Sequence, residues 1–185
     1  MKVLRRTQFG NPILRLVASQ VPETEIKSTF VQDLIADMRY TLENKKYGVG
    51  LAAPQVGVSL RLALIGSKPT PSRPKALKLN MVLINPKITK YHGKKTGMWE
   101  GCISGPDMYG QAMRHKKITL NWTNETGTQK TKTFEGLVSQ IIQHEIDHLD
   151  GKLFVDRVED SKTYMTFSEY RKMMKKERKK LKNKD

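Results

Sequence analysis

Near the start of the chain, apolar residues recur at every fourth position, a pattern that predicts an amphipathic helix. The members of this stripe are Ile26, Phe30, Leu34, Met38 and Leu42, and Val31 and Ile35 beside them widen it. Residues four apart lie on one face of a helix, so we expect all five side chains to be buried. The pattern predicts a helix over residues 24–45, which Gly48 and Gly50 then interrupt.

Between residues 60 and 122 the pattern changes to short apolar and β-branched runs of the kind that form strands. The runs read LRLALI, MVLIN, KITKY and KITLNW, and proline or glycine separates them. Residues 124–127, NETG, predict a hairpin turn into the alternating run TQKTKTF. We therefore expect several short strands in the middle of the chain.

Two more helices are predicted in the last third of the chain. One covers residues 137–149, and Gly151 is placed to end it. Its buried side comprises Leu137, Ile141, Ile142, Ile146 and Leu149. The other begins near Thr166, where the letters TFSE match a capping box, and continues through a run of lysines and arginines.

This arrangement indicates an α+β fold, with small mixed or antiparallel sheets around a central helix. An N-terminal helix and a basic C-terminal helix complete it. At 185 residues the chain has the length of one ordinary domain. We expect residues 1–165 to form its body and residues 166–185 to form a helical extension of the same domain.

The chain is strongly basic, with 34 Lys and Arg against 18 Asp and Glu and a formal charge of +16. Residues 171–185 contain nine basic and two acidic residues, so this segment alone contributes +7. Such a field favours a polyanionic partner, for example nucleic acid or the ribosome. The alternative for the terminal segment is a helix that charge merely keeps in solution.

The chain contains a single cysteine, Cys102, which excludes an intramolecular disulfide and fits a reducing compartment. Its apolar runs are far shorter than the roughly 20 residues of a membrane helix. No apolar stretch of signal-peptide length follows the charged first residues. We therefore expect a protein of the cytoplasm that has no membrane partner.

Residues 144–148, HEIDH, carry the pattern most typical of chemistry. On a helix His144 and His148 lie one turn apart on the same face, so both imidazoles can reach one metal ion. Glu145 beside them is placed to accept a proton from a water and return it to a leaving group. The alternative is an ordinary amphipathic helix with these polar residues in solvent.

Two histidines need a third ligand, and the sequence leaves two candidates open. Cys102 offers a thiolate, although a lone cysteine is usually a small buried residue. Glu169 offers a carboxylate, as in zinc peptidases of the thermolysin type, although it also fits the capping box. A third segment of interest comprises residues 48–57, GVGLAAPQVG. Its small side chains leave room for a substrate backbone, and Gln55 offers an amide donor. The alternative is that the segment is only a turn, as such segments more often are.

The segments GVGLAAPQVG, EGCIS and QHEIDH, in this order, closely resemble the three signature motifs of peptide deformylases. The resemblance extends from the first residues to about Asp156. It implies hydrolysis of the formyl group on the N-terminal formylmethionine of nascent polypeptides, with release of formate. The motif positions depart from the usual pattern at Ile103, where leucine is common, and at Gly105, where a branched aliphatic residue is common.

The resemblance also implies a role for each matching residue. Cys102, His144 and His148 would bind the metal, Glu145 would be the general acid and base, and Gln55 with the backbone N–H of Ile103 would hold the oxyanion. Val49, Gly50 and Gly101 would contact the substrate, and we expect Ile141 to be a wall of the methionine pocket. Gln140, one turn before His144, is a polar residue whose role the sequence does not explain.

The metal implied by the resemblance is one divalent ion per chain, with Fe2+ as the active form and Zn2+ or Ni2+ as possible occupants. We further expect a monomer that contacts ribosomal RNA phosphates through its basic C-terminal helix. Two rival functions are a zinc endopeptidase, which would use Glu169 as its ligand, and a ribosome-binding or RNA-binding protein without activity.

Overall fold

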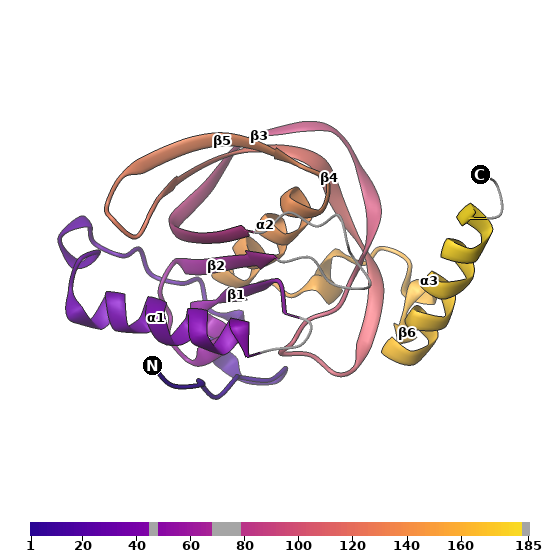
Figure 1. Ribbon diagram of the computed structural model, residues 1–185, viewed down its shortest axis with the longest axis horizontal. Helices are drawn as coiled ribbons and strands as arrows, with labels where there is room; N and C mark the ends of the chain where they lie inside the picture. Colours follow the sequence, from indigo (N-terminus) through magenta and orange to yellow (C-terminus); the bar gives the residue numbers. More distant parts are fainter. Residues whose placement is uncertain (45–47, 68–78, 183–185) are drawn as a thin grey trace.

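The structure is a computed structural model, and it describes residues 1–44, 48–67 and 79–182. These residues form three α-helices, six strands and several short 3-10 turns (Figure 1). The helices are α1 (Thr29–Glu43), α2 (Gly136–Leu149) and α3 (Phe167–Lys182). The strands are β1 (Gly50–Ala52), β2 (Leu62–Ser67), β3 (Leu79–Glu100), β4 (Met108–Thr123), β5 (Gln129–Glu135) and β6 (Met165–Thr166).

The strands join in the order β1-β2-β3-β4-β5, every pair antiparallel, and β6 pairs with the start of β4. The long strand β3 replaces the separate short strands predicted around residues 81–91. Three register shifts, at Ile84/Lys87, Ile88/Lys90 and His92/Lys95, bend β3 without ending it. Because bulges of this kind turn a strand, β3 pairs with β2 at one end and with β4 along the rest.

Apolar side chains gather in two clusters. One packs α1 against β1 and β2 and includes Ile35, Met38 and Leu64. The other packs α2 against β4 and β5 and includes Ile118 and Ile142. Figure 1 shows α2 inside the curve of the strands, with α1 on the other side of β1 and β2. The fold is thus α+β with a central helix, as the sequence predicted.

Helix α1 begins later than predicted, because residues 23–25 form a separate 3-10 turn. Ser28 caps the helix, its Oγ accepting a hydrogen bond from the Val31 N–H at 3.3 Å. The prediction that Phe30 is buried is wrong, since its side chain is 62% exposed. Val31 and Ile35 complete the buried face instead. Position 45, the predicted end, lies outside the described residues.

Helix α2 agrees closely with the prediction, although it begins one residue earlier, at Gly136. The chain leaves it through Gly151, whose φ of 69° is readily adopted only by glycine. A Cβ at Gly151 would also lie 2.5 Å from the Arg15 carbonyl oxygen. The prediction that Leu137 lies on the buried side is wrong, since it is 40% exposed.

Helix α3 extends from the body of the molecule and carries the chain towards its C-terminus (Figure 1). As the capping box predicted, the Glu169 N–H donates to Thr166 Oγ1 at 3.4 Å. Aromatic rings anchor the base of the helix: Tyr170 stacks on Tyr109 of β4 with ring centroids 4.2 Å apart, and it also contacts Trp99 of β3. No helix within the described residues is long and apolar enough to cross a bilayer.

Candidate metal centre and active site

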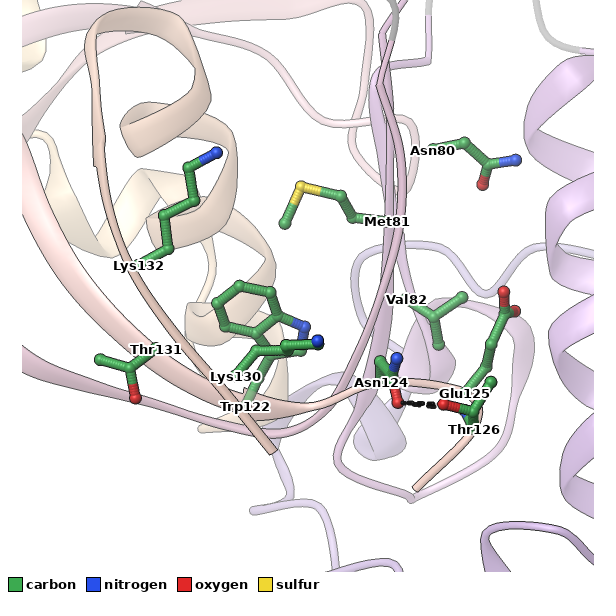
Figure 2. Close-up of a pocket in the computed structure, with 10 residues that line it drawn as sticks. All are labelled: Asn80, Met81, Val82, Trp122, Asn124, Glu125, Thr126, Lys130, Thr131 and Lys132. Carbon is green, nitrogen blue, oxygen red and sulfur yellow. Dashed lines mark hydrogen bonds between the residues drawn. The ribbon is translucent and has the colours of Figure 1, made fainter. Parts of the chain in front are cut away.

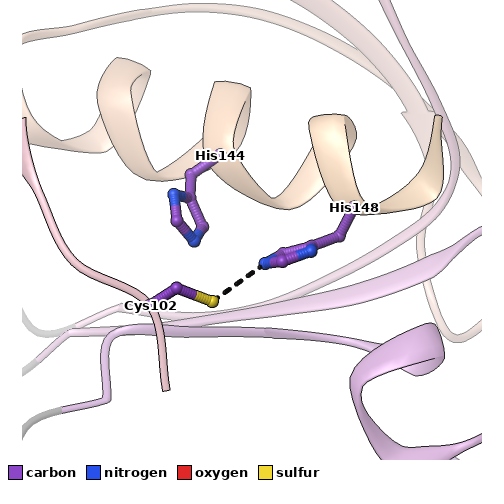
Figure 3. A group of neighbouring side chains, drawn as sticks. All are labelled: Cys102, His144 and His148. Atoms are coloured by element: carbon purple, nitrogen blue, oxygen red, sulfur yellow. Dashed lines mark hydrogen bonds between the residues drawn. The ribbon is translucent and has the colours of Figure 1, made fainter. Parts of the chain in front are cut away.

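Three possible metal ligands converge between α2 and the loop that joins β3 to β4 (Figure 3). The ligand atoms of Cys102, His144 and His148 all lie within 4.8 Å of one another. His148 Nε2 is 3.3 Å from the Cys102 Sγ. The i, i+4 spacing therefore works as predicted, and the fold brings the lone cysteine to the two imidazoles.

This donor set fits a first-row divalent metal, because one thiolate and two imidazoles are ligands that such ions accept. Among the buried side-chain atoms of the described residues, His148 Nδ1 and Glu145 Oε2 have no hydrogen-bond partner. Burial lowers the pKa of His148 well below its ordinary value, so this ring is neutral, as a metal ligand must be. The arrangement can therefore hold a metal ion.

Glu100, the last residue of β3, orients His144. Its Oε2 is 2.9 Å from His144 Nδ1, and the guanidinium of Arg114 holds both of its oxygens at 2.9 Å. Burial alone would raise the pKa of Glu100, but the hydrogen bonds from His144 and Arg114 outweigh it and lower the pKa to about 2. Glu100 is thus a carboxylate that fixes Nδ1–H of His144 and leaves Nε2 for a metal.

His144 itself has a raised pKa. Burial acts to lower it, but the interactions with Cys102 and Glu100 are stronger and raise it well above its ordinary value. Without a metal the ring is therefore protonated on both nitrogens, beside the Glu100 carboxylate. Metal binding at neutral pH must displace one of these protons.

The ion pairs continue beyond Arg114 into the protein. Arg114 also donates to the carboxylate of Asp147 on α2, which in turn accepts from Arg157 Nε at 2.9 Å. Glu100, Arg114 and Asp147 are each at most 5% exposed. Asp147 projects from the same helix as the two histidines, so this network, which we call the interior charge network, ties α2 to β3 and β4.

Glu145 lies between the two histidines in the sequence and is buried beside them. Its carboxylate packs against the Cα of Gly50 on β1, where a Cβ would lie 2.6 Å from Glu145 Cδ. Burial raises the pKa of Glu145 to about 7. A carboxyl group with a pKa near neutrality can both accept and release a proton at physiological pH.

Gln55 lies in the 3-10 turn after β1 and is buried. The Ala52 N–H donates to its Oε1 at 2.8 Å, which points Nε2 towards Cys102 Sγ (3.4 Å) and Ser104 Oγ (3.3 Å). Ile103 follows the cysteine in the β3–β4 loop. The first motif and the second motif thus meet at the thiol group.

The predicted substrate-contact residues surround this site. Val49 and Ile141 pack in the same apolar cluster, next to the turn of α2 that carries Glu145. Gly101 adjoins Cys102, and a Cβ there would lie 2.8 Å from the Tyr109 ring. Gln140, unexplained by the sequence, donates from Nε2 to the Trp99 carbonyl oxygen at 2.9 Å and so ties α2 to the end of β3.

Gly105, a departure from the usual motif, leaves room for a neighbouring aromatic ring. A Cβ at this position would lie 3.1 Å from Cζ of Phe9. Glu169, the rival third ligand, is on α3, where its carboxylate pairs with Lys172 at 2.6 Å and is 57% exposed. The metal group of the described residues does not include it, which removes the basis of the endopeptidase hypothesis.

A separate cavity of about 390 Å³ lies where β3 begins and the β4–β5 hairpin turns (Figure 2). Trp122, Met81 and two lysines, Lys130 and Lys132, contribute to its lining. None of the three metal-ligand candidates lines it. The candidate metal site and this cavity are therefore separate places in the fold.

Comparison with known proteins gives a family match over most of the chain. The family model described as Polypeptide deformylase matches residues 3–164. The chain belongs to the peptide deformylase family. It is therefore a metal-dependent hydrolase that removes the formyl group from the N-terminal formylmethionine of polypeptides.

Individual deformylases are similar over most of their length. The chain is 38% identical over 171 residues to the peptide deformylase of Leptospira biflexa (89% of this chain, 92% of that protein). It is 40% identical over 168 residues to peptide deformylase 2 of a Nostoc species (90% and 92%). The Met-Ala-Ser-bound deformylase structure from Acinetobacter baumannii superposes with a TM-score of 0.80 at 36% identity, covering 84% of this chain and 98% of that one.

The sequence predicted the three candidate metal ligands that the fold brings together, but not the groups that hold them. Glu100 is the first residue of the second motif, so its place was a usable signal. Asp147 likewise lies inside the third motif, whereas Arg114 and Arg157 have no local signature, because their roles arise only when β3, β4 and α2 pack together.

Proposed function

We propose that Cys102, His144 and His148 hold the catalytic divalent metal of this deformylase and that Glu145 is its general acid and base. The observation that carries this proposal is the convergence of three ligand atoms within 4.8 Å beside a buried carboxyl group. When bound there, the metal would act as a Lewis acid and would lower the pKa of a coordinated water towards neutrality.

Glu145 performs the proton transfers. Its carboxylate accepts the proton of the attacking water and then delivers it to the nitrogen of the departing amine, as the bond between the formyl carbon and that nitrogen breaks. The products are formate and a peptide with a free N-terminal methionine. The pKa of about 7 suits both transfers, because a catalytic pKa near the operating pH balances acceptance against release.

Gln55 and the backbone N–H of Ile103 stabilise the oxygen of the tetrahedral intermediate. Gln55 is suited to this because the bond from Ala52 fixes its amide before substrate arrives, so little reorganisation is needed. Each such donor contributes roughly 3 to 4 kcal/mol in enzymes where one has been removed. Val49, Gly50 and Gly101 contact the substrate backbone, and Ile141 forms a wall for the methionine side chain.

Fe2+ is the active ion in this proposal, and Zn2+ or Ni2+ can occupy the same ligands. The test is to load the purified chain anaerobically with each ion and measure formate release from a short formyl-Met peptide. We expect the highest turnover with Fe2+. Absence of release with every ion, alongside an active reference enzyme, would refute the catalytic proposal.

Two variants test the roles of individual residues. Glu145→Gln should keep the metal but lower kcat by a factor on the order of 10² to 10⁴, since it removes the proton acceptor but no ligand. Glu135→Gln, at an exposed glutamate just before α2, is the matched control.

Cys102→Ala should lose the metal, whereas Glu169→Ala should keep it. Metal content after dialysis gives the answer.

We also propose that the enzyme acts in the cytoplasm as a monomer and approaches nascent chains by binding ribosomal RNA phosphates through α3. Residues 1–165 then form the catalytic body and residues 166–185 a basic helical extension. The lysines of α3 at positions 175, 176, 179 and 180 are all exposed, which supports an electrostatic contact.

The test for ribosome binding uses two full-length variants of equal charge. One replaces Lys175, Lys176, Lys179 and Lys180 by glutamine. The other, the control, replaces Lys87, Lys90, Lys94 and Lys95 of β3, which are also exposed. Only the first variant should lose affinity in ribosome co-sedimentation. The slope of the logarithm of its binding constant against the logarithm of salt concentration should become shallower by about 3. Equal loss in both variants would mean that net charge, not α3, governs binding.

A further inference from the structure

Residues 6–9, which we call the N-terminal strap, cross both loops that carry the motifs. The Thr7 N–H donates to the Gln55 carbonyl oxygen at 2.8 Å, and the Phe9 N–H donates to the Ser104 carbonyl oxygen at 2.8 Å. The backbone of the strap is therefore fixed on both sides of the active site. A further hydrogen bond from the strap to the second motif comes from a side chain.

That side chain is Arg6, which is half-buried and binds a turn formed by residues 102–105. The Gly105 N–H donates to the Cys102 carbonyl oxygen at 3.0 Å, closing a β-turn whose central peptide joins Ile103 to Ser104. Arg6 Nη1 donates to the carbonyl oxygen of this peptide at 2.8 Å. The N–H of the same peptide, that of Ser104, points the other way and donates to the Cys102 Sγ at 3.4 Å.

The two hydrogen bonds use opposite ends of one conjugated amide. A cation that binds the carbonyl oxygen draws electron density from the amide and makes its N–H a stronger donor, as in any chain of hydrogen bonds that polarise one another. The guanidinium also holds the peptide plane in the orientation that aims the N–H at sulfur. The effect of the charge thus passes from Arg6 through the Ile103–Ser104 peptide to the sulfur of Cys102.

We propose that Arg6 is a positioning residue that acts through this peptide on the metal-binding thiolate. The inference rests on the proposed metal site and adds a residue from outside the three motifs. Hydrogen bonds to a coordinating sulfur reduce the electron density that the sulfur gives to the metal. Such outer contacts commonly alter metal affinity or activity by about 10- to 100-fold. Arg6 thereby tunes the metal without touching it.

The test uses Co2+ as a spectroscopic probe in the full-length chain. The thiolate-to-cobalt charge-transfer band reports the electron density on sulfur. In Arg6→Met the band should move to lower energy, and kcat/KM for a formyl-Met peptide should fall roughly tenfold. Arg6→Lys, which keeps a cationic donor, should give a band between those of Arg6→Met and the parent. Arg5→Met, an adjacent exposed arginine, removes the same charge and should leave both readouts unchanged.

Each outcome is decisive. A band that coincides in Arg6→Met and the parent refutes the inference, and so does an equal shift in Arg5→Met, because net charge would then be the cause. If Arg6→Met does not fold, an unmoved band in Arg6→Lys refutes it in the same way. The absence of any sulfur band in the parent chain would instead refute the metal site, so the two failures are distinguishable without measuring turnover.

Discussion

The interior charge network and helix α3 use charge in opposite ways. Inside, Glu100, Arg114 and Asp147 are almost fully buried, and each has an oppositely charged partner within hydrogen-bonding distance. On α3, lysines and arginines far outnumber acidic residues and most of the described side chains are exposed. The first arrangement fixes the candidate metal ligands in place, whereas the second presents an excess of positive charge to solvent.

This difference changes how the net charge of +16 is understood. The total indicates a polyanionic partner but says nothing of the reaction, because the charges that serve catalysis cancel within the network. Substitutions in the two regions should therefore differ greatly in their cost.

The largest effect should come from Arg114→Met, which leaves two carboxylates buried without their shared cation. Breaking a buried ion pair in this way costs about 3 to 5 kcal/mol, so the free energy of unfolding of the metal-free protein should fall by that amount. Urea denaturation followed by circular dichroism measures it. Unfolding at the parent's midpoint would show that the network contributes little to stability.

A smaller loss is expected from Gly50→Ala, because the interior site has no spare room beside Glu145. The added methyl group would displace the carboxylate, at a cost of roughly 1 to 3 kcal/mol in stability and with a marked fall in kcat. Gly97→Ala is the matched control, since a Cβ there meets the flexible end of Gln111. Equal kcat values for the two variants would contradict this account of Gly50.

The sequence predicted the helices and the helix face that carries two candidate metal ligands because these signals are local. The spacing of His144 and His148 defines one face of α2 in any context. By contrast, β3 is a single bent strand only because β4 pairs along it. The residues near Arg114 in the sequence do not indicate its two carboxylate partners. Phe30 was misplaced for a related reason: the apolar stripe was wide enough for two choices of face, and the packing of α1 on β2 decided between them.

A pair outside the network should matter less and should depend on pH. Burial alone would raise the pKa of Asp156, but hydrogen bonds from Arg15 and the Leu153 N–H lower it. The pair therefore stabilises the fold above the ordinary aspartate pKa of about 4, and this contribution disappears as pH falls through the lowered value. Asp156→Asn should cost up to about 1 kcal/mol at pH 6, a difference that vanishes in acid. A difference that grew with acidity would contradict the assignment.

The smallest effect is expected on α3 itself. Lys172→Met removes the exposed pair with Glu169 and should change the free energy of unfolding by less than about 0.5 kcal/mol. Deformylation of a short peptide should also be unchanged. A thermal melt and a kcat/KM measurement suffice, and a loss approaching that of Arg114→Met would erase the contrast between the two regions.

The aromatic stack at the base of α3 has a geometric consequence. Tyr170 rests on Tyr109, and Tyr109 rests in turn on Gly101, the residue before the cysteine ligand. A helix of 16 residues is about 24 Å long, so a tilt of about 10° at its base would move its tip by about 4 Å. The stacked rings therefore fix the angle between α3 and the segment that carries Cys102, and a small change in their stacking would move the far end of α3 by several times as much as its base.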